Sequence, residues 1–367
     1  MASTNPLVRL GALGQSPWYD FITRELIATG ELRALVSNDG LLGMTSNPTI
    51  FEKAIAGSAD YDDDIRRLAS EGKQAEEIFE GLAIADVRAA CDAFQAVYER
   101  TQGADGLVSL EVSPELARDA AGTEAAARRL WAAVARPNLM IKIPGTVEGL
   151  GAIERCIADG INVNVTLLFS VARHEAVMEA YLRGLERRAA AGQPVDRVAS
   201  VASFFVSRVD TKVDPLLDAA GRRDLRGTMA IANACLAYQA FERVFRGDRW
   251  EALARCGARV QRPLWASTST KDPSLPDVYY VEALIAPHTV NTLPPETFAA
   301  YRDHGNPAVR IAEGIATAPG RLAALAEAGI DLALATAELE DEGVEKFAAS
   351  FRSLLGGIDA KAGALTN

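Results

Sequence analysis

Short apolar runs alternate with longer amphipathic segments along most of this 367-residue chain. Short apolar runs bounded by turn residues are typical of buried strands. Eight runs have this pattern: 17–21, 41–47, 106–112, 138–144, 161–168, 197–206, 262–267 and 289–293. Helical spacing of apolar residues recurs between them, for example over 86–100, 123–135, 171–190 and 227–245.

Strands that alternate with helices predict a parallel sheet with helical crossovers. Eight such units predict a closed (β/α)8 TIM barrel, for which about 250 residues is typical, with the surplus in insertions and surface helices. We expect one barrel domain over residues 1–367, with about 306–367 as C-terminal helices packed on the barrel. The tail from Gly320 to about Gly356 has the spacing of two or three helices. A doubly wound open sheet is the alternative architecture.

The eighth strand has two candidates. The segment 278–285 is apolar enough to form it, which would leave 289–293 as a loop. We prefer 289–293, because Pro294 and Pro295 end that run cleanly.

Polar side chains recur on one face of the predicted strands. Side chains alternate between the two faces of a strand, and in a closed barrel one face lines the lumen. The polar residues that share a face within their runs are Thr45 and Asn47, Ser109 and Glu111, Lys142, Asn162 with Asn164 and Thr166, and Ser203. Most lie near the C-terminal ends of the runs, where (β/α)8 enzymes have their active sites. Each alone is explained by a core hydrogen bond, and the segment 45–48 equally by a helix N-cap. Together they indicate a polar site.

Lys142 is the least expected of these residues, because it lies in the middle of the apolar run 138–144. The chain has 38 lysine and arginine residues, of which only about seven are lysines. Burying an ammonium group without a partner is costly, but a buried lysine can become a neutral amine nucleophile. The alternative is a lysine at a strand end that pairs with a carboxylate or reaches water.

The net charge of −11 argues against nucleic acid or an anionic membrane as the main partner, since both favour a basic surface. The four cysteines are scattered and form no close pair, which disfavours a zinc site or a disulfide framework and fits a reducing compartment. No signal peptide or membrane span is evident, so we expect a cytoplasmic protein.

Several other chemistries find little support in the sequence. The three histidines, His174, His288 and His304, lie outside the apolar runs, which disfavours a Ser/His/Asp set, and we expect His174 on the exposed side of its helix. The glycines after Pro144 lack the spacing of a phosphate-binding loop. We expect no metal and no organic cofactor.

Two basic residues follow late strands and are candidates for binding a phosphate. Arg208 follows the sixth run and Lys271 the seventh, so both belong at C-terminal strand ends. Guanidinium, ammonium and hydroxyl groups together suit a phosphate. The alternatives are exposed ion pairs, Arg208 with Asp210 and Lys271 with Asp272.

Taken together, these segments resemble the transaldolase family of class I Schiff-base enzymes, in its long bacterial form. The resemblance is carried, in family order, by residues 43–55, 107–113, 140–146, 160–170, 201–208 and 262–271. It covers residues ~15 to ~305 and leaves the C-terminal helices less diagnostic. The family fold is a (β/α)8 barrel, in agreement with the strand pattern.

The resemblance also implies roles for individual residues. It implies that Lys142 forms the Schiff base, that Asp20 moves a proton in carbon–carbon cleavage, and that Glu111 and Thr166 activate water. The implied substrate-binding residues are Thr45, Asn47, Asn164, Ser203, Phe205, Arg208, Ser267 and Lys271. One departure stands out: short family members have an arginine two residues after the serine of the seventh strand, whereas Ser267 here is followed by Thr268 and Ser269. Lys271 is the nearest cation, and we expect it to take over part of phosphate binding.

The implied reaction transfers a dihydroxyacetone unit from sedoheptulose 7-phosphate or fructose 6-phosphate to glyceraldehyde 3-phosphate or erythrose 4-phosphate, in the pentose phosphate pathway. The expected partners are phosphorylated sugars, and the expected state is a monomer or homodimer. The alternatives are a fructose-6-phosphate aldolase-type lyase that uses the same lysine, a non-catalytic phosphosugar-binding barrel, and a sugar transferase of secondary metabolism.

Overall fold

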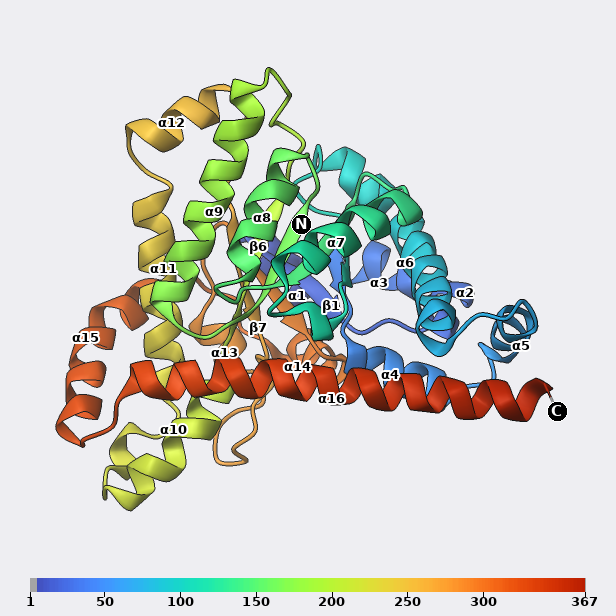
Figure 1. The fold of residues 1–367 in the computed structure, drawn as a ribbon. Helices are drawn as coiled ribbons and strands as arrows, with labels where there is room; N and C mark the ends of the chain where they lie inside the picture. The colour runs from blue at the N-terminus through green and yellow to red at the C-terminus, as the bar shows by residue number, and fades with distance from the viewer. Residues whose placement is uncertain (1–4, 367) are drawn as a thin grey trace.

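A computed structural model describes residues 5–366, in which eight parallel strands close into a barrel surrounded by helices (Figure 1). Each strand pairs with the next along the chain, and β8 closes on β1. The strands are β1 (Gln15–Asp20), β2 (Gly43–Thr45), β3 (Leu107–Glu111), β4 (Leu139–Pro144), β5 (Val163–Leu168), β6 (Ser200–Phe205), β7 (Arg262–Ala266) and β8 (Thr289–Leu293). The predicted (β/α)8 barrel is confirmed, and the open sheet is excluded.

Each predicted run overlaps one strand, and the main differences lie at the ends. β8 has the predicted bounds, whereas the rival segment 278–285 contains helix α13. The run 41–47 yields a strand of only three residues, because Asn47 caps the following helix. Its Oδ1 accepts a hydrogen bond from the Ile50 amide (3.0 Å), and Pro48 opens the helix with a φ suited to that position.

Helices connect the strands and cover the outside of the barrel (Figure 1). Before β4 they are α1 (Pro6–Ala12), α2 (Arg24–Ala28), α3 (Glu31–Asn38), α4 (Pro48–Ala56), α5 (Asp62–Ser70), α6 (Ala75–Arg100), the 3-10 helix η1 (Pro114–Leu116) and α7 (Ala120–Val134). After β4 they are α8 (Gly149–Ala158), α9 (Val171–Ala190), α10 (Ser207–Ala219), the 3-10 helix η2 (Arg223–Leu225), α11 (Met229–Val244), α12 (Asp248–Arg255), α13 (Tyr279–Ala283), α14 (Pro295–His304), α15 (Ile311–Glu327) and α16 (Leu332–Thr366).

The register between neighbouring strands aligns three polar residues at one level of the barrel. Glu111 of β3 is opposite Lys142 of β4, and Lys142 is opposite Asn164 of β5. In the same way Asp20, the last residue of β1, is opposite Thr45 of β2. Residues at the same level and of the same parity lie side by side in the lumen, so the strand register alone brings a lysine between a carboxylate and an amide.

Gly43 leaves room in β2 for the indole of Trp18, which is fully buried on the neighbouring strand. A Cβ atom at position 43 would lie 2.4 Å from the Trp18 ring, far inside van der Waals contact. The pairing of β1 with β2 therefore depends on the absence of a side chain at this position.

The C-terminal helix α16 is 35 residues long and runs along one end of the molecule, beside α4, α10 and α5 (Figure 1). At about 1.5 Å per residue it spans roughly 50 Å. Its buried residues recur every three or four positions, which gives one continuous face toward the barrel: Ala335, Thr336, Leu339, Gly343, Phe347, Ala348, Phe351, Leu354 and Ile358. The helix crosses the end of the barrel where the C-terminal ends of the strands lie, and it contacts β5 directly.

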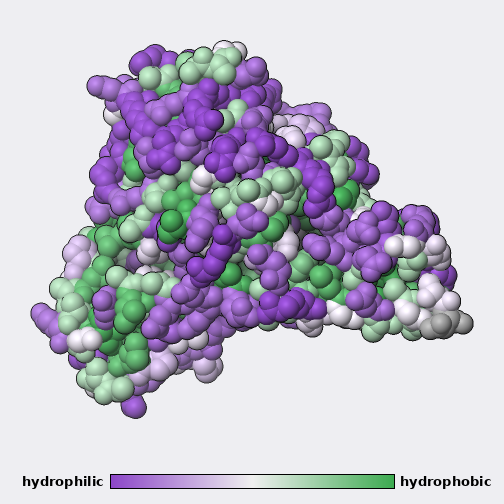
Figure 2. Space-filling view, in the orientation of Figure 1, coloured by the Kyte–Doolittle hydropathy of each residue, from purple (hydrophilic) through white to green (hydrophobic). Residues whose placement is uncertain are grey.

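Hydrophilic side chains cover much of the face in Figure 2, and apolar residues gather over α15 and its turn into α16. Leu334, in the first turn of α16, is 59% exposed. None of the helices in residues 5–366 combines the length and the apolar character needed to cross a membrane.

Candidate active site

Lys142 lies inside the barrel with its amine surrounded by protein groups. The residue is 5% exposed, and its Nζ donates a hydrogen bond to the Ser46 carbonyl oxygen (3.2 Å). The same Nζ is 3.1 Å from Glu111 Oε2 and 5.5 Å from the centre of the Phe347 ring. Its carboxylate partner therefore lies on the preceding strand, β3, within the lumen and not on the surface.

Glu111 is a buried carboxylate with spare hydrogen-bonding capacity. Apart from the ion pair with Lys142, neither carboxylate oxygen has a hydrogen-bond partner among the described residues, and the same holds for Thr166 Oγ1. Burial raises the pKa of Glu111, and the nearby Lys142 charge opposes that rise. Both side chains can therefore bind a further polar group, and the raised pKa suits Glu111 to exchange a proton.

Asp20 closes β1 and lines the same cavity as Lys142. Burial raises its pKa, while the charges of Lys142 and Arg208 act in the opposite direction. The effect of desolvation on the pKa of Asp20 is larger than the opposing effect of the two cations. A raised pKa of this kind is expected for a carboxylate that both accepts and donates a proton. Asp20 and Glu111 are thus two titratable groups that share one lysine.

Asn164 and Asn47 are both held by neighbours, in different ways. Asn164 donates from Nδ2 to Ser109 Oγ (3.0 Å), and its Oδ1 accepts from Ser203 Oγ (2.7 Å). Asn47 is the N-cap of α4 through its Oδ1. The helix-cap interpretation of the segment 45–48 is therefore confirmed, and the same residue also lines the main cavity.

The main cavity has a volume of about 240 Å³ and opens at the C-terminal end of the barrel. Ten of the twelve candidate residues line it, and Glu111 and Asn164 are the exceptions. The ten are Asp20, Thr45, Asn47, Lys142, Thr166, Ser203, Phe205, Arg208, Ser267 and Lys271. Asn164 and Glu111 lie behind this wall, in contact with Ser203 and Lys142 respectively.

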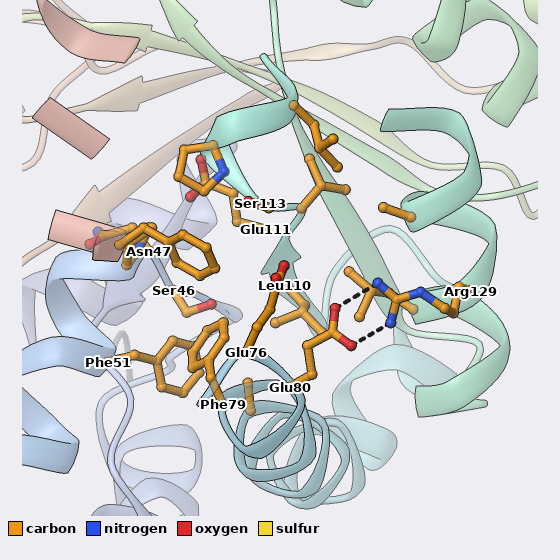
Figure 3. Close-up of a pocket in the computed structure, with 18 residues that line it drawn as sticks. Ser46, Asn47, Phe51, Glu76, Phe79, Glu80, Leu110, Glu111, Ser113 and Arg129 are labelled. Atoms are coloured by element: carbon orange, nitrogen blue, oxygen red, sulfur yellow. Dashed lines mark hydrogen bonds and ion pairs between the residues drawn. The ribbon is translucent and has the colours of Figure 1, made fainter. Parts of the chain in front are cut away.

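Glu111 faces a second, smaller cavity of about 40 Å³. Figure 3 shows Leu110 and Glu111 of β3 among the residues around this cavity, with Phe51 and Phe79 at another part of its wall and the pair of Glu80 and Arg129 at one side. Phe351 of α16 also contributes to its lining.

Arg208 and Lys271 stand at the mouth without the ion pairs that the sequence allowed. The Asp210 carboxylate instead accepts hydrogen bonds from the Ala230 amide (2.7 Å) and the Tyr280 hydroxyl (2.9 Å). Asp272 pairs with Arg226 at 2.8 Å. Both surface-pair alternatives are therefore wrong.

The two cations instead have neutral neighbours. The Arg208 guanidinium lies 4.8 Å from the centre of the Phe205 ring, and burial lowers its pKa. Lys271 Nζ donates to Ser269 Oγ (2.7 Å), and the hydroxyls of Ser207 and Ser267 are 3.0 Å apart. Cations with hydroxyl rather than carboxylate neighbours are suited to an anionic ligand.

Several further residues of the cavity wall were not foreseen from the sequence, among them Thr49, Lys53, Lys346 and Phe347. The first two belong to α4, which begins directly after the Asn47 cap. The other two belong to α16 and are more than 70 residues away in sequence from the nearest predicted site residue, Lys271. Their local sequence has ordinary helical spacing, so no signal marked them as site residues.

His174 was expected on an exposed helix face, and this expectation is wrong. The residue is fully buried between α9 and its neighbours, with its ring 5.9 Å from that of Phe204 in an edge-on arrangement. α9 is covered by both α8 and α11, so two of its faces are buried instead of one. Burial lowers the pKa of His174 to about 4, so the ring is neutral at physiological pH.

Within residues 5–366, no cluster of three or more histidine, cysteine, aspartate or glutamate side chains is arranged to hold a metal ion. The reactive groups of the site are an amine and two carboxylates with raised pKa values, of which Lys142 and Asp20 line the main cavity and Glu111 contacts Lys142 from behind its wall. The fold and the site thus define a (β/α)8 enzyme that is built around a buried lysine at the C-terminal end of its strands.

Comparison with known proteins specifies the family. The sequence profile of the family described as Transaldolase/Fructose-6-phosphate aldolase matches residues 17–358. A protein named Transaldolase from Acidothermus cellulolyticus is 53% identical over 358 residues, which cover 97% of this chain and 96% of the relative. Transaldolase of Thiobacillus denitrificans is 49% identical, covering 94% and 97%, and Transaldolase 2 of a Nostoc strain is 47% identical, covering 97% of both. The chain belongs to the transaldolase/fructose-6-phosphate aldolase family and is an enzyme of the transaldolase type.

Proposed function

We propose that this protein transfers a dihydroxyacetone unit from a ketose phosphate to an aldose phosphate through an imine on Lys142. The main support is the position of the Lys142 amine, which is enclosed between Glu111 and the Ser46 carbonyl and lines one cavity with Asp20. The relatives' name, Transaldolase, supports the same reaction.

In the first step Glu111 takes a proton from the Lys142 ammonium group, and the free amine attacks the C2 carbonyl of the ketose. The carbinolamine then loses its hydroxyl as water, with the proton supplied by Glu111 and the leaving oxygen held by Thr166. The product is a protonated imine, which can accept the electrons of the C3–C4 bond. Covalent catalysis of this kind replaces one difficult step by two easier ones.

In the second step Asp20 accepts the proton of the C4 hydroxyl as the C3–C4 bond breaks. The bond electrons move into the imine, which leaves an enamine on Lys142 and releases an aldose phosphate. The incoming aldose phosphate reverses this step, since the enamine carbon attacks its aldehyde and Asp20 returns the proton to the oxygen. Hydrolysis of the new imine frees the product ketose. General acid–base steps of this type contribute ~10²–10⁴-fold each.

The fructose-6-phosphate aldolase alternative uses the same lysine but releases the three-carbon unit to water. Phe347 of α16 stands 5.5 Å from the Lys142 amine and is only 4% exposed. A cover that limits water beside the enamine favours transfer over release. Product analysis with and without erythrose 4-phosphate separates the two reactions, because only the transferase requires the acceptor.

Trapping the imine tests the proposal directly. Borohydride added with fructose 6-phosphate should reduce the imine and attach a three-carbon unit to the peptide that contains Lys142, as measured by mass spectrometry. Lys142→Met should abolish both labelling and transfer. Labelling at another lysine, or full transfer activity in Lys142→Met, would exclude the mechanism.

The cellular setting follows from the same reaction. We infer a role in the pentose phosphate pathway, with phosphorylated sugars as partners and a monomer or homodimer as the working form. Four free thiols suit a reducing compartment such as the cytoplasm.

A further inference from the structure

Two neighbouring cavities share one basic wall at the mouth of the barrel. The main cavity of about 240 Å³ adjoins a more open one of about 600 Å³, and four residues line both: Arg208, Ser267, Lys271 and Lys346. Arg208 lies in the first turn of α10 after β6, and Ser267 and Lys271 follow β7; all three were candidates from the sequence. Lys346 comes from α16 and brings a third cation to the same place.

The charge of Lys346 is not neutralised by any ion pair or hydrogen bond within residues 5–366, although this chain carries an excess of acids. Its neighbours on α16 have other partners: Glu342 pairs with Lys212 (2.6 Å) and Glu345 with Arg352 (2.6 Å). Other basic side chains around this helix are also paired, such as Arg173 with Glu340 (3.1 Å) and Lys361 with Asp62 (2.7 Å). An unpaired lysine that shares a cavity wall with Arg208 and Lys271, neither of which forms an ion pair with a carboxylate of the described residues, marks a site for an anion.

The backbone at Lys346, an exposed residue, is positioned by the neighbouring residues of α16. Gly343, one turn earlier, lets the helix approach β5, because a Cβ atom there would lie 3.1 Å from Leu167 Cδ2. Phe347 packs beneath the helix, with its ring 5.8 Å from the Arg208 guanidinium and 5.5 Å from Lys142 Nζ. Lys346 is therefore carried by the segment of α16 that packs against the end of β5 and the cavity.

We propose that Lys346 is a phosphate-binding residue that completes, with Arg208 and Lys271, the site for the phosphate group of the sugar substrates. This inference rests on the proposed function and assigns part of substrate recognition to the C-terminal helix. The planar guanidinium of Arg208 can bind two phosphate oxygens, while the two lysines act as point charges from the segment after β7 and from α16. The third cation also accounts for the missing arginine after Ser267, because the charge comes from another part of the chain.

The test compares Lys346→Met with Lys346→Arg and with a matched control, Lys212→Met. Lys212 lines the open cavity too, but its charge is already neutralised by Glu338 (2.8 Å) and Glu342 (2.6 Å). Lys346→Met should raise KM for fructose 6-phosphate about tenfold, the low end expected for a hydrogen bond to a charged group. It should weaken competitive inhibition by inorganic phosphate by a similar factor. Lys346→Arg should recover most of both losses, and Lys212→Met should change neither by more than about twofold.

Two further measurements separate this inference from the proposed reaction. Binding of inorganic phosphate, followed by calorimetry on the wild-type and variant proteins, requires no turnover. Borohydride labelling with unphosphorylated fructose reports on Lys142 without a phosphate, and Lys346→Met should leave it unchanged. The inference is overturned if phosphate binds equally to wild type and Lys346→Met, or if the labelling falls as much as the phosphate affinity. Failure of wild type to label at Lys142 would instead contradict the proposed function.

Discussion

Truncation of Phe347 to alanine is the sharpest test of the idea that α16 covers the active site. The phenyl ring is 4% exposed and lies between the Lys142 amine and the Arg208 guanidinium, at 5.5 Å and 5.8 Å. Its removal takes away packing between the helix and the barrel. It also opens a path for water toward the imine.

The structure sets the expected size of the effect. Truncation of a buried phenylalanine typically lowers the free energy of unfolding by about 3–5 kcal/mol. The two cation–π contacts add at most about 2 kcal/mol each where the cation is desolvated. We therefore expect a loss of at least about 3–5 kcal/mol in urea unfolding. We also expect a several-fold rise in the release of free dihydroxyacetone from fructose 6-phosphate when no acceptor is present.

Phe351→Ala provides the matched control for this variant. Phe351 lies one turn further along α16, is 3% exposed, and packs edge-on against Phe79 at 5.6 Å. It lines the small cavity next to Glu111 and not the main cavity. Both truncations should destabilise the protein similarly, but only Phe347→Ala should shift the ratio of water release to transfer. An equal shift in the two variants would refute the covering role, since the effect would then come from a loosened helix alone.

Three further changes test individual groups. Asp20→Asn should slow transfer ~10²–10⁴-fold while borohydride still labels Lys142, because the imine forms before Asp20 acts; loss of labelling would contradict that order. Glu111→Gln should slow the labelling itself in single-turnover experiments, and an unchanged rate would remove its role in imine formation. Burial lowers the pKa of His174 from an ordinary 6.5 to about 4, so the folded state favours the neutral ring. The resulting contribution to the free energy of unfolding is fully present at pH values above 6.5. That contribution, roughly 3 kcal/mol, should be lost as pH falls from 6.5 toward 4. His174→Phe should show a flatter pH dependence of the unfolding free energy, and equal pH profiles would exclude the linkage.

The polar row of the lumen could be predicted from the sequence because strand parity and barrel closure are simple geometric rules. Glu111, Lys142 and Asn164 share a parity, and parallel pairing placed them at one level. Parity alone was too coarse for Asn162, which precedes β5 and bonds the carbonyl oxygens of Pro137 (3.0 Å) and Leu139 (2.9 Å). The position of a side chain along the barrel depends on where its strand begins and ends. Apolar runs in the sequence locate these bounds poorly.

The errors concern contacts between segments that are distant in the chain. Arg208 and Asp210 are close in sequence, which suggested an ion pair. They are two residues apart on α10, and side chains at this spacing on a helix do not face each other. Asp210 turns toward the start of α11 and Tyr280, contacts that only the tertiary structure reveals. His174 was misplaced for a similar reason, because its helix has neighbours on two sides.

The placement of α16 was the largest gap, and Gly343 explains why it has this form. Glycine inside a helix costs about 1 kcal/mol relative to alanine, so local propensity alone disfavours it at this position. This cost is offset where the helix must pack closely against a neighbouring element. At position 343 a Cβ atom would lie 3.1 Å from Leu167 and 3.4 Å from Phe169, at the end of β5. That approach brings Phe347 against the Lys142 side of the cavity and Lys346 against the phosphate side. A transferase must exclude water while it still admits two sugar phosphates in turn, and a single turn of α16 supplies both the apolar cover and the charge that recognises each substrate.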